Sequence, residues 1–247
     1  MSKTKEFFAI ANDYLKRIKE NEKQSIIDVA HIIADCISND GLIQLFGIDH
    51  GHAFSMELGN RAGGLVNFHR WNVPDLVMRN EITEAELLKP DFNMDVTMAH
   101  KLLATYSIFD QDMFLLISSA ANEPIIVEVA LKAKEKNQKV VALVNKNHAN
   151  VSPILHESGK KLTDIADYVL DDCAPYPDLV ISLSDGTPFN QVSTICGNVI
   201  AQMITAEIYR YLMDKEVDCP ILLSANVKGA DEHNRAAVIK YWDRLNS

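Results

Sequence analysis

The sequence predicts an α/β fold: a three-layer α/β/α sandwich around a five-stranded parallel sheet, preceded by a pair of helices. Strand-like apolar segments alternate with amphipathic helical segments from residue 42 onward, which is typical of a parallel sheet covered on both faces. Five segments have strand character, a usual number for one sheet. They are residues 42–46, 114–118, 139–144, 168–170 and 179–183.

The helices are predicted from apolar residues at helical spacing. Phe7, Ile10, Tyr14 and Ile18 recur at this spacing, and a second such series follows the polar break near Asn21. We therefore expect residues 1–40 to form two helices that pack on the core or on a partner subunit. Further helices are expected over 123–136, 191–213 and 234–245. Residues 71–95 contain two prolines and many charges, and we expect a long excursion over the sheet's edge.

Composition limits the partners. The chain has 247 residues, 34 acidic and 24 basic, and a net charge of −10, which repels nucleic acid and acidic membrane surfaces. Its four cysteines form no CxxC pair, so reduced thiols are expected. The charged N-terminus has no apolar stretch long enough for a signal peptide. The sequence thus predicts a cytoplasmic protein with a small-molecule ligand, no nucleic-acid partner and no membrane.

A first candidate site follows the first strand. That strand ends at Gly47, and the loop after it contains Asp49, His50, Gly51 and His52 before a helix begins. Backbone N–H groups at such a turn can bind a polar ligand. In open α/β sheets, the carboxyl edge of the strands is the usual ligand site.

A second strand-to-helix turn has the sequence ISSAANEP. Ser118 and Ser119 follow the strand, and Pro124 lies in the first turn of the next helix. Hydroxyls beside helical N–H groups can hold an anion. The alternative is that Ser119 or Asn122 only caps the helix.

These motifs carry a family resemblance. GIDHGH is followed by Glu57, Leu58 and Arg61, the second turn has the sequence ISSAANE, and SANVKGADEHN lies near the C-terminus. Together they resemble the SIS (sugar isomerase) domain family, in particular its phosphoheptose-isomerase-like branch. The resemblance covers almost the whole chain. It implies a SIS domain over residues 41–247 with flavodoxin-like topology.

The resemblance also implies a function. A sugar phosphate, or an amino-sugar phosphate, would be isomerised between aldose and ketose, with Glu57 as base and His50 or His52 as acid or electrophile. For Glu57 the alternative is a surface pair with Arg61 at i,i+4. No cofactor is expected, and relatives imply a homodimer or homotetramer. The expected substrate-binding residues are Gly47, Gly51, Ser118, Ser119, Asn122, Ser193, Thr194, Asn226 and His233.

Three departures weaken the expected phosphate site. Gly51, Ala120 and Glu123 stand where the family commonly has Ser or Thr. Glu123 also places a carboxylate at the helix N-terminus, where it would compete with an anionic ligand. Either the substrate carries another group, or Ser118, Ser119, Ser193 and Thr194 supply the hydroxyls.

The sequence does not predict a metal site. A cluster of His50, His52, Glu57 and Gln191 can be imagined, but Ala53 stands where metal-binding relatives have a histidine ligand. For His233 and Asn234, a capping or surface role is the alternative to ligand contact.

Two other functions stay open beside the isomerase. One is a non-catalytic phosphosugar-binding module that has lost its phosphate hydroxyls. The other is a lyase or etherase acting on an N-acetylated sugar acid phosphate. A DNA-binding sensor is disfavoured, because acidic residues offset the lysines of the first 38 residues.

Overall fold

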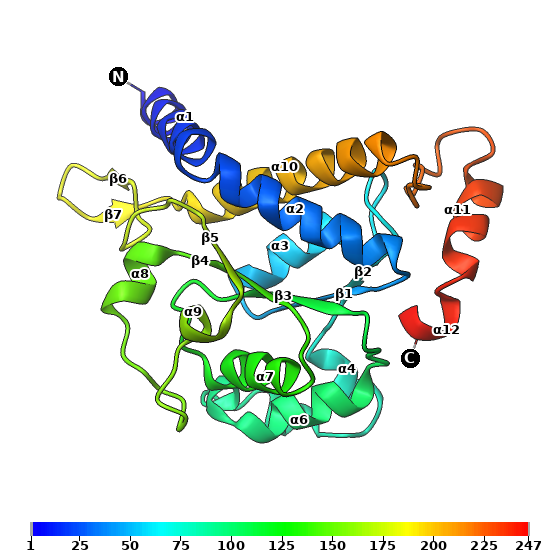
Figure 1. Cartoon of the computed structure of the whole chain (residues 1–247). Coiled ribbons are helices and arrows are strands. Elements are labelled where there is room, and N and C mark those ends of the chain that lie inside the picture. The colour runs from blue at the N-terminus through cyan, green and yellow to red at the C-terminus, as the bar shows by residue number, and fades with distance from the viewer. Residues whose placement is uncertain (1, 247) are drawn as a thin grey trace.

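The computed structural model describes residues 2–246 and confirms the predicted α/β fold. Its five-stranded sheet is parallel throughout, in the order β2-β1-β3-β4-β5 (Figure 1). This is the flavodoxin-like strand order. The strands are β1 (Ile43–Gly47), β2 (Phe68–Arg70), β3 (Met113–Ile117), β4 (Val140–Val144) and β5 (Tyr168–Asp171).

One of the five predicted strands is wrong. Residues 179–183 do not join the sheet; β6 (Ile181–Ser182) instead pairs antiparallel with β7 (Pro188–Phe189). Of its four apolar residues only Ile181 is buried; Val180 is half-buried, and Leu179 and Leu183 are exposed. The fifth strand is β2, whose Phe68 pairs with Ile43 of β1.

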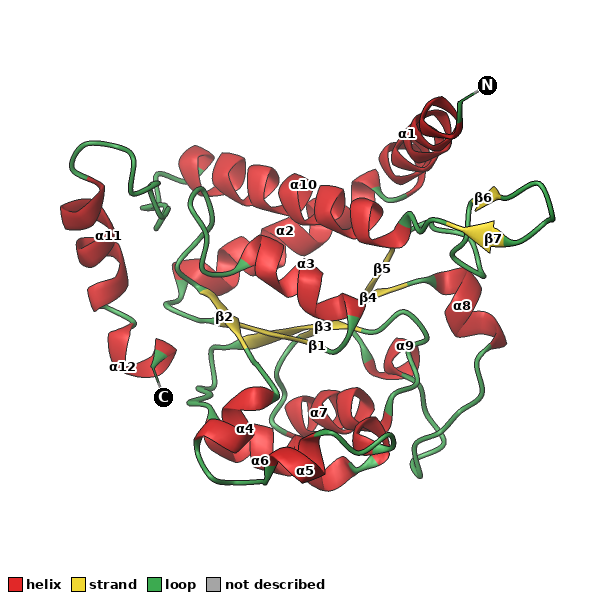
Figure 2. Cartoon of the chain, turned by 180° about the vertical axis from the view of Figure 1, so that it is seen from behind, coloured by secondary structure: helices red, strands yellow, loops and turns green. Residues whose placement is uncertain are grey.

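Helices cover both faces of the sheet, as expected (Figure 2). One face carries α1 (Lys3–Asn21), α2 (Lys23–Ser38), α3 (His50–Leu58) and α10 (Ser193–Asp214). The other carries α6 (Val96–Thr105), α7 (Pro124–Glu135) and α9 (Leu162–Ile165). Strand side chains alternate between the two cores: Leu45 packs in the first and Phe46 in the second.

The two N-terminal helices form where predicted. Ser2 caps α1 by accepting a hydrogen bond from the backbone of Lys5, and Ile18 of α1 is fully buried. Val29 and Ile33 of α2 are fully buried in the same core as α10. Within one chain, therefore, the pair packs on the sheet domain.

The excursion over residues 71–95 folds into α4 (Pro74–Met78), α5 (Glu84–Leu87) and the 3-10 helix η1 (Phe92–Met94). Leu76 and Phe92 are buried beside Trp71 in the core that α6 and α7 share. The excursion therefore packs on a face of the sheet and not simply over its edge. This packing places residues 72–93 beside the carboxyl end of β1.

The C-terminal segment returns to the amino ends of the strands. Ile221 bridges to Leu65 ahead of β2, and α11 (Ala230–Ile239) and α12 (Trp242–Leu245) follow (Figure 1). The remaining helix, α8 (Lys146–Val151), follows β4. Among residues 2–246, no helix combines the length and apolar character needed to cross a membrane.

Candidate functional site

The candidate site lies where β1 ends and α3 begins. Strand order reverses between β1 and β3, and ligands of such sheets bind at this point of the carboxyl edge. Helix α3 begins at His50, one turn earlier than the predicted loop allowed. His50, Gly51 and His52 are therefore in the first helical turn, and only Ile48 and Asp49 separate this turn from the strand.

Two glycines let α3 approach the sheet closely. A Cβ atom at Gly47 would lie 2.9 Å from the backbone carbon of Gly51 and 3.0 Å from Cβ of Ile117. A Cβ at Gly51 would lie 3.1 Å from both Cγ2 and the carbonyl oxygen of Ile117. These distances are tighter than ordinary van der Waals contact, so the hydroxyl-bearing residue common in the family at position 51 does not fit this packing.

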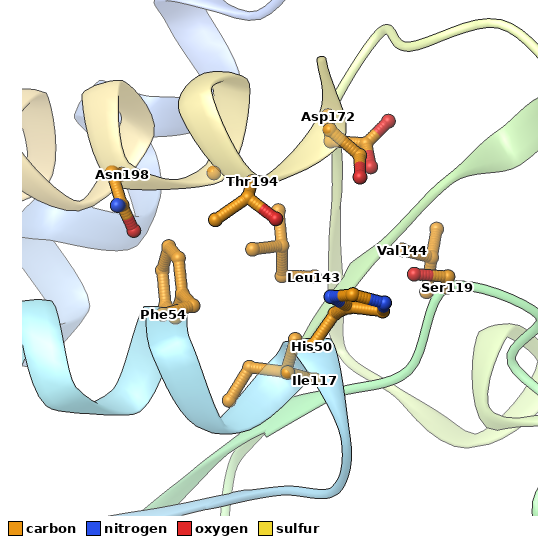
Figure 3. Close-up of a pocket in the computed structure, with 12 residues that line it drawn as sticks. His50, Phe54, Ile117, Ser119, Leu143, Val144, Asp172, Thr194 and Asn198 are labelled. Atoms are coloured by element: carbon orange, nitrogen blue, oxygen red, sulfur yellow. The ribbon is translucent and has the colours of Figure 1, made fainter. Parts of the chain in front are cut away.

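The turn separates two cavities. The smaller, of about 30 Å³, lies between α3, α10 and the ends of β3, β4 and β5 (Figure 3). Five of the predicted site residues line it. They are His50, Gly51, Ser119, Ser193 and Thr194.

The smaller cavity also contains a buried acid that the sequence analysis missed. Asp172 is 6 % exposed, and its Oδ1 accepts hydrogen bonds from Asn145 Nδ2 at 2.9 Å and from Ala174 N at 2.8 Å. Burial raises the pKa of Asp172 to about 7, helped by the negative charges of Asp171 and Asp178. Its place two residues after the predicted strand 168–170 was the available signal.

The larger cavity, of about 770 Å³, lies on the other side of the turn, against the excursion. Its volume is within the range of small-molecule sites, roughly 300–1,000 Å³. Gly47 and His52, both predicted site residues, line it. The other lining residues are Ile48, Asp49, Asn72, Val73, Pro74, Asp75, Leu87, Lys89, Pro90, Phe92 and Asn93.

His52 and Lys89 give the larger cavity its chemistry. Burial lowers the pKa of His52 from its ordinary value of 6.5, and the positive charge of Arg70 lowers it further. The imidazole is therefore neutral at pH 7. Lys89 is the only lysine or arginine lining either cavity in the described part of the chain. No sequence motif marked Lys89 or Asp75, because both lie in the excursion.

The expected anion site on the second turn is occupied by the protein's own carboxylate. Ser118 donates a short hydrogen bond to the Glu123 carboxylate at the start of α7. Asn122 Nδ2 donates to the carbonyl of Pro153 at 2.9 Å. Ser118 and Asn122 thus serve local structure and line neither cavity.

A carboxylate also lies at the N-terminus of α10, where it caps the backbone. Asp178 accepts hydrogen bonds from the backbone N–H groups of Val192, at 3.0 Å, and Ser193, at 3.2 Å. A carboxylate at this position satisfies the helix dipole that would otherwise favour an anionic ligand. At this end of α10, the groups left to bind a ligand in the smaller cavity are the hydroxyls of Ser193 and Thr194.

Glu57 lines neither cavity. It pairs with Arg61 at i,i+4, the alternative that the sequence left open, and accepts a hydrogen bond from Gln202 Nε2 of α10 at 2.5 Å. It lies about two helical turns from His50 along α3. Within one chain, then, the structure does not bring Glu57 to His50 and His52.

Asn226 and His233 lie apart from the other predicted residues. Asn226 is in the exposed loop before α11, and His233 lines a different cavity near Asp40, at the amino end of β1. His233 Nε2 lies 2.9 Å from the carbonyl of Ile221. Asn234 makes paired hydrogen bonds with the backbone of Leu223, at 2.7 and 2.9 Å. These contacts hold the C-terminal segment in place.

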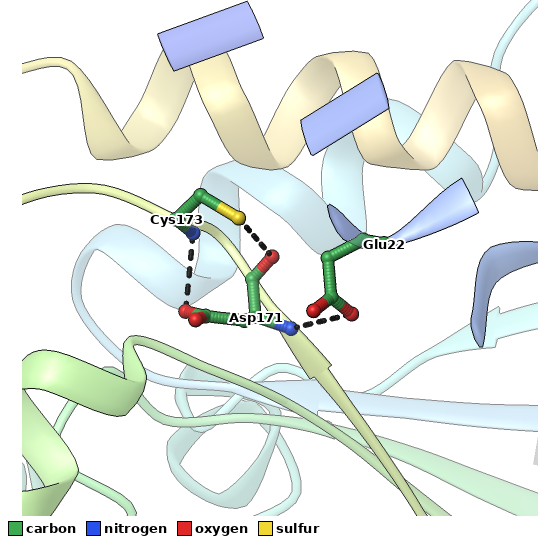
Figure 4. A group of neighbouring side chains, drawn as sticks. All are labelled: Glu22, Asp171 and Cys173. Atoms are coloured by element: carbon green, nitrogen blue, oxygen red, sulfur yellow. Dashed lines mark hydrogen bonds between the residues drawn. The ribbon is translucent and has the colours of Figure 1, made fainter. Parts of the chain in front are cut away.

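Among residues 2–246, the side chains that could together hold a metal ion are Glu22, Asp171 and Cys173, whose ligand atoms lie within 4.8 Å of one another (Figure 4). This group lies near the smaller cavity and is different from the His50, His52, Glu57 and Gln191 cluster considered from the sequence. Lys146 Nζ lies 3.4 Å from Glu22 and supplies a positive charge there. Glu22 also accepts from the backbone N–H of Asp171, so the group connects the α1–α2 junction to the end of β5.

Comparison with protein families identifies the class. The SIS domain model matches residues 6–145, more than half of the chain. The chain therefore belongs to the SIS domain family.

The similar curated proteins carry the family name UPF0309. The UPF0309 protein of Geobacillus kaustophilus is 31 % identical over 241 residues, covering 97 % of this chain and 94 % of its own length. The UPF0309 protein of Listeria innocua is 32 % identical over 234 residues, which cover 94 % of this chain and 92 % of the Listeria protein.

Solved structures agree on the fold. A phosphoheptose isomerase from Neisseria gonorrhoeae matches with a TM-score of 0.55 and 14 % identity, covering 83 % of this chain and 95 % of its own. A phosphoheptose isomerase from Francisella tularensis matches with a TM-score of 0.55 and 16 % identity, and the match covers 85 % of this chain and 100 % of the isomerase. At this identity the likeness shows the fold alone.

The buried acid predicts a pH-dependent stability. Between the ordinary aspartate pKa of 3.8 and the folded-state pKa of about 7, Asp172 binds a proton in the folded state that it does not bind when unfolded. Stability therefore falls as pH rises through this window, by at most about 1.4 kcal/mol for each pH unit. We expect Asp172→Asn to lose less stability than wild type between pH 5 and pH 8, measured by urea unfolding.

The matched control is Asp35→Asn, which removes an exposed carboxylate paired with Lys215. Its loss of stability from pH 5 to pH 8 should parallel that of wild type. Parallel profiles for wild type and Asp172→Asn would show that Asp172 titrates normally.

Proposed function

We propose that this protein binds a sugar phosphate in the larger cavity and interconverts its aldose and ketose forms. The observation that carries the proposal is the neutral His52, placed in a cavity large enough for a sugar phosphate at the carboxyl edge of β1. The SIS fold and the phosphoheptose isomerases that share it support the same class of reaction.

The chemistry requires a group that accepts a proton and returns it. Isomerisation through an enediol moves a proton from the carbon beside the carbonyl to the neighbouring carbon, while a second proton moves between the two oxygens. An imidazole that is neutral at pH 7 can take the carbon-bound proton as the free base and return it as the acid. His52 is the residue we assign to this step.

The remaining polar groups suit the rest of the ligand. Asp49 and Asp75 can accept hydrogen bonds from sugar hydroxyls, and the amides of Asn72 and Asn93 can both donate and accept. Lys89 offers an ammonium group for the phosphate. The phosphate is better placed there than on the second turn, where Glu123 would repel it.

A second candidate function rests on that same Glu123. With Ser118 bound to its carboxylate, the expected phosphate hydroxyl is already used. This observation favours a non-catalytic module that binds an unphosphorylated sugar. The homodimer or homotetramer and the cytoplasmic location expected from the sequence remain predictions.

Ligand binding separates the two candidates. Any ligand that binds only the folded state raises the melting temperature. We expect phosphorylated aldoses and ketoses to raise it in a thermal-shift screen and their unphosphorylated forms to have a much smaller effect. Lys89→Met should reduce this preference for phosphate, with Lys5→Met, an exposed lysine of α1, as its control. Equal shifts from both forms of a sugar would favour the binding module.

Two variants test the base. General acid–base groups contribute about 10²–10⁴-fold to turnover, so His52→Gln should reduce isomerase kcat by at least about 100-fold. Glu57→Gln should reduce it far less, because Glu57 is held by Arg61 and Gln202 outside the cavities. The reverse ranking, measured as aldose-to-ketose conversion, would assign the base to Glu57 as the family resemblance suggested.

A further inference from the structure

The floor of the larger cavity is held by a tyrosine that does not itself line it. The hydroxyl of Tyr106, the residue after α6, donates to Asp75 Oδ2 at 2.7 Å and accepts from the backbone N–H of Asn72 at 2.8 Å. Asp75 and Asn72 both line the cavity. Among the described residues, no group donates to the other carboxylate oxygen, Oδ1 of Asp75, which leaves it available for a ligand.

The ring of Tyr106 is itself fixed by aromatic neighbours. It stacks on Trp71, with ring centroids 4.9 Å apart and planes 15° apart, and meets His69 edge-on at 5.3 Å. Tyr106 is 6 % exposed and Trp71 1 %. Such packing leaves the phenol few alternative positions, so its hydroxyl has a defined location.

Trp71 and His69 are fixed in turn by a polar side chain in β1. Trp71 Nε1 donates to Oε1 of Gln44 at 2.8 Å, and His69 Nδ1 lies 2.9 Å from the same oxygen. Gln44 is fully buried, and its amide nitrogen donates to Asp112 at 2.9 Å. A buried amide whose donor and acceptor are both used orients its neighbours strongly.

Asp112 connects this chain of contacts to the C-terminus. Its carboxylate accepts from the backbone N–H groups of Leu42 and Phe109 and pairs with Arg244 of α12. The Asp112 side chain is fully buried and that of Arg244 is 11 % exposed. Contacts therefore run without a break from α12, at the amino end of the sheet, to the cavity at its carboxyl end.

We propose that Tyr106 is a positioning residue that fixes Asp75 for binding a hydroxyl pair of the sugar, with Oδ1 facing the ligand. The proposal rests on the proposed ligand site in the larger cavity. Tyr106 holds one oxygen of Asp75, so the carboxylate cannot rotate freely, and the second oxygen is left without a protein donor in a residue that lines the cavity. Tyr106 touches neither the ligand nor the reacting atoms.

The test is Tyr106→Phe, which removes the hydroxyl and keeps the ring on Trp71. Without this hydrogen bond to a charged group the Asp75 carboxylate can rotate, so KM for the sugar phosphate should rise by about tenfold or more. The kcat should stay within about twofold of the wild-type value, because the contact between Asp75 and the sugar is made equally in the ground state and the transition state. A purely structural defect would instead lower the active fraction, reducing apparent kcat at constant KM.

Tyr209→Phe is the matched control. It removes a tyrosine hydroxyl that donates to the carbonyl of Gly63, away from the cavity, and it should leave KM unchanged. Asp75→Asn should raise KM at least as much as Tyr106→Phe. If the wild type binds without turnover, the dissociation constant from calorimetry takes the place of KM.

The outcomes are distinct. An unchanged KM or dissociation constant in Tyr106→Phe overturns the positioning role while leaving the proposed function intact, whatever happens to the melting temperature. A wild type that neither binds nor converts any sugar phosphate overturns both. A raised KM in Tyr106→Phe together with an unchanged one in Tyr209→Phe supports the assignment.

Discussion

The close approach of α3 to the sheet is the constraint on which the rest of this site depends. Gly47 and Gly51 face each other across the turn, and neither position has room for a side chain beside Ile117. Because α3 lies this close to the sheet, its first turn separates two cavities, and His50 lines one cavity while His52 lines the other. The close packing of position 51 on Ile117 thus favours glycine over a hydroxyl-bearing residue there.

Carboxylates of the chain occupy the positions where a phosphate was first expected. Glu123 holds the Ser118 hydroxyl, Asp178 caps α10, and Asp172 is buried in the smaller cavity. In our proposal, the charges of Glu123 and Asp178 favour an anion on the other side of the turn, at the excursion that carries Lys89. The excursion in turn is anchored by Trp71 and Tyr106, so in our proposal ligand recognition depends on a segment without any family motif.

The sequence predicted the layers, the N-terminal helices and four of the five strands, because these elements have strong apolar periodicity. It missed β2, since three residues cannot show a period, and it assigned a weak strand to residues 179–183, of which only Ile181 is buried. Local motifs singled out His50, His52, Ser119, Ser193 and Thr194, each of which lines one of the two cavities; their role in ligand binding remains a prediction. Asp75, Lys89 and Tyr106 reach the site only through tertiary packing, which no local spacing records.

The central claim is that a neutral His52 meets the ligand in the larger cavity. Nitrogen-15 NMR of the histidine side chains, assigned with His52→Gln, tests it directly. At pH 7 the ring nitrogens of His52 should show the neutral imidazole, and they should shift on titration with a sugar phosphate that the protein binds. A protonated His52 at pH 7, or ligand-induced shifts confined to other histidines while His52 stays unchanged, would contradict the account.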